Sequence, residues 1–272
     1  MRSEALLPMI LMLGCGENLT PPETAEAART TCYPNLDGRI DFEEFRLLLD
    51  HPASYFVSTE EQSIDVEGVV DDRGIRIWSY EEPGRDELAS IRAVSVRDEW
   101  YSGSFPSEAF VLEEPGRTVD AVYLQDSTGL TALGYASREE NPSAGKTLLV
   151  YQAPVMVHRY PLRRNDVFGG VGVVGVDGVL NGLPYAGQDT WEIEVAATGE
   201  LGLPDVTLVG VYRLDISVSS QSDPPAGAPI VRRAVSFLFE CLGEVVHFEG
   251  RAGGPSNQLG TVVSSRRLTL RR

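Results

Sequence analysis

The chain has 272 residues, of which 40 are acidic and 23 are basic, so its formal charge is −17 at pH 7. Such an acidic surface repels phosphate backbones and argues against nucleic acid as a partner. The length is enough for one large β domain, or two small ones, with a substantial core.

Residues 1–14 have the layout of a secretory signal peptide. Arg2 precedes an apolar run over Ala5–Leu13, and the small residue Gly14 stands before Cys15. The run has about nine residues, whereas a membrane-spanning helix needs about 20. We therefore expect a cleaved leader and not a permanent transmembrane anchor.

The segment Met12-Leu13-Gly14-Cys15 resembles the lipobox of bacterial lipoproteins. In that family the cysteine is acylated and becomes the new N-terminus, so the resemblance implies a lipid on Cys15 that holds the protein to a membrane of the bacterial cell envelope. Gly16 lacks the aspartate that marks inner-membrane retention in some bacteria, which favours the outer membrane and leaves its periplasmic or surface face open. The alternative is an ordinary cleaved signal or a misassigned start.

Residues 15–23 are polar and contain proline, which predicts a flexible tether behind the lipidated cysteine. Residues 24–53 predict a helix–loop–helix element. Thr24–Thr31 is alanine-rich, and Asp41–Leu49 carries apolar residues at helical spacing before His51-Pro52 ends the pattern.

Residues 33–44, between these two predicted helices, resemble the calcium loop of EF-hand proteins. Its candidate calcium-binding residues are Asn35, Asp37, Arg39, Asp41 and Glu44. Tyr33 stands in place of the first carboxylate, which predicts a weakened site. The alternative is a structural loop, in which Asp37-Gly38 turns the chain, Ile40 packs inward and Asp41 caps a helix.

If Cys15 carries a lipid, Cys32 and Cys241 remain as an even pair in an oxidising compartment. Disulfides persist there, so we predict a bond that joins the N-terminal element to a late strand. Two buried free thiols are the alternative, because geometry decides whether the bond can form.

Residues 54–272 predict one antiparallel β domain, formed as a curved sheet or as a sandwich or half-barrel. Short runs rich in β-branched and aromatic residues alternate with turn signals such as Pro115-Gly116 and Asn181-Gly182. Residues 139–145 mark either a boundary between two sub-halves or one long hairpin loop. The predicted fold is therefore mainly β with a small N-terminal helical element. The predicted strands are Ile64–Val70, Ile75–Tyr80, Ile91–Val96, Val119–Leu124, Thr147–Val150, Trp191–Ala196, Thr207–Val218 and Val231–Phe239.

Several patterns that resemble chemical sites have simpler interpretations. Gly170–Gly175 fits G-x-G-x-x-G, but turn signals follow it where a nucleotide-binding fingerprint needs a helix, so we predict a strand with a bulky close neighbour. His158 and His247 are predicted to be half-exposed strand residues. Glu113-Glu114 is predicted to be a solvated turn pair, and Arg266 a residue of a solvated strand end.

Residues Leu148–Gly250 are similar in outline to uncharacterised envelope lipoproteins of curved-sheet type, which are related to periplasmic lipoprotein carriers. The resemblance rests on Tyr160-Pro161-Leu162, the hairpins around Trp191, the strand Val206–Ser219 and the segment Phe237–Val245. It implies a fold more than a function.

We expect a non-catalytic binding or scaffold module for an apolar ligand or an envelope protein. The alternative is a secreted hydrolase whose site is assembled from dispersed residues.

Overall fold

The structure is a computed structural model that describes residues 32–45, 47, 49–82, 86–253, 259 and 261–271. The signal-like leader, Cys15, the tether and the first expected helix, Thr24–Thr31, lie outside the described residues. The fold is mainly β, with 61% of residues in strands. Within the described ranges there is no helix long and apolar enough to cross a membrane.

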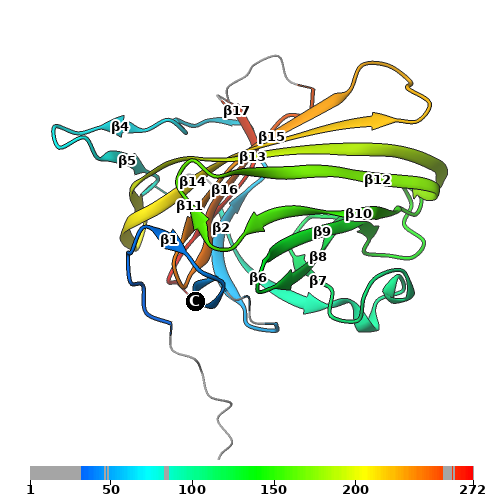
Figure 1. Ribbon diagram of the computed structural model, residues 1–272, viewed down its shortest axis with the longest axis horizontal. Helices are drawn as coiled ribbons and strands as arrows, with labels where there is room; N and C mark the ends of the chain where they lie inside the picture. The colour runs from blue at the N-terminus through cyan, green and yellow to red at the C-terminus, as the bar shows by residue number, and fades with distance from the viewer. Residues whose placement is uncertain are drawn as a thin grey trace, which may run out of the picture. The chain divides into compact units, whose positions relative to one another are not determined.

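Twelve strands close into one antiparallel barrel, which is the main architectural unit (Figure 1). Around the barrel each strand pairs with the next in the order β12-β10-β9-β8-β7-β6-β2-β17-β16-β15-β14-β13, and β13 pairs back with β12. The predicted curved antiparallel sheet is therefore confirmed, and its closure removes the two free edges that a half-barrel would expose. The barrel strands are β2 (Ala53–Ser58), β6 (Glu87–Ser95), β7 (Phe110–Glu113), β8 (Val119–Asp126), β9 (Gly129–Ser137), β10 (Leu148–Arg159), β12 (Val167–Leu180), β13 (Leu183–Leu203), β14 (Val206–Ser222), β15 (Ile230–Phe239), β16 (Gly243–Gly250) and β17 (Thr261–Leu268).

In the residues that the structure describes, five short strands and three 3-10 turns lie outside the ring of barrel strands. The short strands are β1 (Arg39–Ile40), β3 (Gln62–Ser63), β4 (Val69–Val70), β5 (Arg76–Ser79) and β11 (Leu162–Arg163). β5 pairs in parallel with β13, and the β4–β5 hairpin extends away from the barrel wall at the left of Figure 1. The 3-10 turns are η1 (Phe42–Glu44), η2 (Val96–Asp98) and η3 (Ser102–Ser104).

The small helical element expected near the N-terminus is not shown. In the described part of Asp41–Leu49 the chain forms only the single turn η1. The side chain of Gln125 explains why the helix stops there, since its amide donates to the carbonyl of Phe45 (3.0 Å) and accepts from the backbone N–H of Leu47 (3.0 Å). Asp50 N then bonds the carbonyl of Ala93. These tertiary bonds satisfy backbone groups that a longer helix would pair internally.

Apolar residues pack on both faces of the barrel wall. An inner cluster includes Val157, Ile193 and Leu214, which point into the barrel. An outer cluster packs Trp78 and Tyr80, from β5 and the residue after it, onto Phe237 and other outward residues of β15 and β16. A further outer cluster lies beneath the turns at residues 96–105.

The glycine-rich stretch Gly170–Gly175 lies within strand β12, as predicted. Gly172 shows why a glycine stands there, because a Cβ atom built on it would lie 2.7 Å from atoms of the Tyr151 ring. The bulky neighbour expected from the pattern is thus the Tyr151 side chain, which lies against β12 where β10 and β12 share only two paired positions.

Candidate functional site

A cavity of about 530 Å³ lies inside the barrel. This volume is within the range of about 300–1,000 Å³ that is typical of small-molecule sites. One side is formed by apolar residues of β7, β9, β10, β13 and β14, which we call the apolar wall. Its members are Phe110, Leu112, Leu130, Val157, Ile193 and Ile216.

The described residues of the segment 32–50 (32–45, 47, 49 and 50), called here the plug, cross one end of the barrel. Phe45 and Leu47 line the cavity, and the ring of Phe45 meets the ring of His158 on β10 at 5.1 Å between centroids. Ile40 is fully buried in the inner cluster. Because the plug contacts strands from several sides of the barrel, it forms the floor of the cavity.

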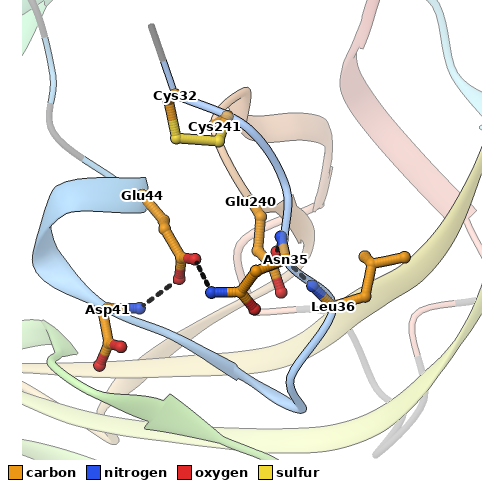
Figure 2. The surroundings of a disulfide bond; sticks show 7 residues. All are labelled: Cys32, Asn35, Leu36, Asp41, Glu44, Glu240 and Cys241. Carbon is orange, nitrogen blue, oxygen red and sulfur yellow. Dashed lines mark hydrogen bonds between the residues drawn. A yellow bond between two sulfur atoms is a disulfide. The ribbon is translucent and has the colours of Figure 1, made fainter. Parts of the chain in front are cut away.

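The disulfide Cys32–Cys241 fixes the start of the plug, which confirms the predicted pairing (Figure 2). The Cα atoms of the two cysteines are 5.5 Å apart. Beside the bond, the buried carboxylate of Glu240 accepts from the backbone N–H groups of Asn35 (2.7 Å) and Leu36 (2.9 Å). The plug is therefore held at the turn between β15 and β16 by a covalent bond and by a charge-assisted contact.

The candidate calcium residues all lie in the plug, where their side chains contact one another or nearby backbone groups. Figure 2 shows three of them: Asn35, Asp41 and Glu44. One oxygen of Glu44 accepts from the side-chain amide of Asn35 (2.6 Å), and the other accepts from the backbone N–H of Asp41 (2.9 Å), as in a capping box. Arg39 pairs with Asp37 (3.2 Å) and Asp41 (3.0 Å).

This geometry favours the structural alternative for the loop. Burial raises the pKa of Glu44, and nearby carboxylates including Glu240 and Asp41 raise it further, against the lowering effect of the Asp41 N–H. In the part of the chain that the structure describes, no group of three potential metal ligands is brought together. Calcium binding at Asn35, Asp37, Arg39, Asp41 and Glu44 stays a prediction.

The cavity wall opposite the plug's apolar contacts carries a charged network. Arg266 on β17 bonds both Glu114, after β7, and Glu244 on β16. Arg117 bonds Glu114 (2.8 Å) and Glu249 (3.0 Å). The sequence-based description of Glu114 and Arg266 as solvated was wrong, because both side chains are largely buried and face the interior of the barrel.

The network holds its carboxylates in the charged form. Burial by itself would raise the pKa of Glu244, but Arg266, His247 and the Ser236 hydroxyl lower it well below its usual range. The pKa of Glu114 is lowered in the same way by Arg266 and Arg117 in spite of burial. These groups therefore form compensated ion pairs rather than free acids or bases.

Ser236, His247 and Glu244 lie together and must be compared with a catalytic triad. The Ser236 hydroxyl oxygen is 2.8 Å from His247 Nδ1, and a Glu244 oxygen is 3.2 Å from the same nitrogen. In a triad the nucleophile and the acid occupy opposite nitrogens of the imidazole. Ser236 is also fully buried and contacts Glu244 directly (2.7 Å). The cluster therefore lacks the arrangement that would activate the serine.

His158 is buried beside the plug, which corrects the expectation of a half-exposed strand residue. Among the described residues its Nδ1 has no hydrogen-bond partner, and its ring lines the cavity. Burial lowers its pKa from 6.5 to about 4. At neutral pH the imidazole is uncharged and adds a weakly polar group to the floor.

The end of the cavity away from the plug carries Arg232 on β15. Its guanidinium reaches the hydroxyl of Tyr135 on β9 at 3.4 Å and lies 5.8 Å from the centroid of that ring. β9 and β15 are separated by four strands in the shorter direction around the barrel, so the contact crosses the interior.

Sequence reasoning missed the residues that make the cavity amphipathic: Glu114, Arg117, Arg232 and Arg266. A usable signal existed at Arg232, which occupies the face of β15 opposite to the apolar outward residues Val235 and Phe237. It could be read only once the inner face was known. Arg266 on β17 had no such signal, because its neighbours Ser265 and Arg267 are polar.

Comparisons with protein families, with curated proteins and with solved structures find no match to this chain.

Proposed function

We propose that this protein is a non-catalytic binding module of the bacterial cell envelope that holds an apolar small molecule inside its barrel. The observation that carries the proposal is the cavity of about 530 Å³ with its apolar wall. Inner-face residues such as Leu112 and Ile216 remain partly accessible although they point into a closed barrel. A ligand that covers this apolar surface removes it from water, which makes binding favourable.

The closed construction supports storage or transport of the ligand rather than a passing contact. A complete ring of paired strands surrounds the cavity, and the plug covers one end with a disulfide at its start. The molecule therefore separates an apolar ligand from water on most sides, as a carrier in an aqueous compartment requires.

The first experiment is native mass spectrometry of the protein purified from its own envelope. A companion mass that is lost on denaturation supports the binding module, and its fragmentation identifies the chemical class. The variant Ala121→Trp fills the cavity from β8 and should abolish the companion mass. The matched control is Val176→Trp, because Val176 is 84% exposed on β12. A bare chain, or equal retention by both variants, would contradict the proposal.

The location in the envelope is part of the same proposal. A lipid on Cys15 would hold the protein to the outer membrane, and the disulfide Cys32–Cys241 supports a compartment outside the reducing cytoplasm. The mass of the mature protein tests this directly. We expect acylation at Cys15 and a gain of two hydrogens on reduction. An unmodified Cys15 would refute the proposed lipid anchor.

A secreted hydrolase remains the second candidate, and the contact of Ser236 with His247 is the observation that favours it. The shared Nδ1 atom and the full burial of Ser236 weigh against it. A serine-directed fluorophosphonate probe separates the two candidates. Labelling that disappears in Ser236→Ala would favour the hydrolase, whereas no labelling of the native protein favours the binding module.

A further inference from the structure

Arg232 differs from Arg117 and Arg266, two further arginines that line the cavity. Arg117 and Arg266 each bond two carboxylates. Among the residues that the structure describes, no carboxylate lies within salt-bridge distance of Arg232, and its one hydrogen bond is the long contact to the Tyr135 hydroxyl (3.4 Å). A guanidinium carries five N–H donors, so most of those on Arg232 are unmatched by protein acceptors.

The acidic groups that act on Arg232 through space are already engaged. Asp189 accepts from the hydroxyls of Tyr151 and Ser220, each at 2.5 Å, and Glu249 accepts from Arg117. Both stabilise the charge of Arg232 without contacting it. The site therefore holds a partly buried cation that pairs with no carboxylate among the described residues.

The position of Arg232 suits the head group of an elongated ligand. Phe239 ends β15 next to the turn that carries the plug, and Arg232 lies seven residues before it. Seven residues of an extended strand span about 23 Å, so Arg232 lies far from the plug. Pairing places Arg232 beside Val218 and Val218 beside Trp191. The indole Nε1 of Trp191 is buried without a well-formed hydrogen bond, although it interacts electrostatically with the Tyr151 hydroxyl. Trp191 also lines the cavity, two strands away from Arg232.

We propose that the ligand is an anionic amphiphile whose carboxylate or phosphate monoester is bound by Arg232, while its apolar tail lies along the apolar wall towards the plug. This inference rests on the proposed function, because it names the ligand class of the same cavity. A planar guanidinium matches the oxygens of a carboxylate or phosphate in a bidentate manner. The tail supplies the burial of apolar area, and the head group sets the orientation.

The test compares three ligands with the same tail: hexadecanoate, hexadecyl phosphate and hexadecanol. Displacement of a fluorescent apolar probe is measured on the full mature protein, together with inorganic phosphate and acetate as tail-less anions. The native protein should prefer the two anionic amphiphiles over hexadecanol by about tenfold or more, as expected for a charge-assisted contact. The tail-less anions should not displace the probe.

The variant Arg232→Gln should lose this preference and bind all three long-chain ligands within about threefold of the native affinity for hexadecanol. Arg159→Gln, which changes an exposed arginine on β10, should keep the native preference. Equal affinities for acid and alcohol in the native protein would refute the head-group inference and leave the binding module standing. Displacement by phosphate alone would assign the site to a free anion and refute the amphiphile. Failure of every long-chain ligand to bind would remove both proposals.

Discussion

The buried histidine of the cavity floor gives the sharpest stability prediction. His158 has a folded-state pKa of about 4, whereas the ordinary value is 6.5. The folded protein therefore favours the neutral ring, and protons bind preferentially to the unfolded chain between these two values. The stability from the neutral ring is fully present above pH 6.5 and is lost as the pH falls towards 4.

The size of the effect follows from the two pKa values. At pH 7.5 both states hold a neutral ring, so protonation of His158 causes no loss of stability. At pH 5.0 the unfolded histidine is almost fully protonated while the folded one is not, which costs about 2 kcal/mol of unfolding free energy. Glu244 does not interfere in this pH window. Its pKa is lowered in the folded state, so the stability that it contributes is lost only as the pH falls below the ordinary value of 4.5.

The assay is urea unfolding at pH 7.5 and pH 5.0, with the disulfide intact, for the native protein and for His158→Leu. The native protein should lose about 2 kcal/mol more than the variant between the two pH values. His51→Gln, which changes an exposed histidine, should retain the native pH dependence. Parallel pH profiles for the native protein and His158→Leu would refute the reasoning, because they would show that His158 is protonated equally in both states.

Two further predictions concern the barrel wall. Gly172→Ala should destabilise the protein by about 1–3 kcal/mol in thermal unfolding, since its Cβ would lie 2.7 Å from the Tyr151 ring. The control Gly103→Ala meets no atom within 4 Å and should be near neutral. Equal effects of the two substitutions would contradict the close packing at Gly172. Arg266→Met should lower the free energy of unfolding by about 3–5 kcal/mol in urea, because it leaves Glu114 and Glu244 buried without their cation. The control Arg92→Met removes the exposed ion pair with Glu113 and should cost less than about 1 kcal/mol. A small effect of Arg266→Met would show that water reaches those glutamates.

Local patterns determined the strand class of this protein and several of its turns. Val119–Leu124, Trp191–Ala196, Thr207–Val218 and Val231–Phe239 all lie within strands, and Asn181-Gly182 forms the two-residue turn between β12 and β13. Ile64–Val70 was less well predicted, because only its last two residues form a strand. Alternation and turn residues act over a few positions, so the sequence alone displays them.

The N-terminal element shows where local reasoning failed. Helical spacing over Asp41–Leu49 was a real pattern, yet Gln125, 80 residues from Phe45, satisfies the backbone groups that a helix would have used. The disulfide was predictable because only two cysteines remained once Cys15 was set aside, and a shared redox environment favours their pairing. A hydrogen bond from a distant strand has no such signature.

The sequence by itself determined that the chain forms antiparallel strands and that Cys32 and Cys241 could pair. Only the tertiary structure decided that the strands close into a ring, and with that which face of each strand is the interior. Glu114 and Arg266 therefore look like surface charges in the sequence, although closure places them against each other inside the barrel. The physical reason is that alternation assigns residues to two faces but does not say which face is enclosed, because that depends on pairings between strands far apart in the chain.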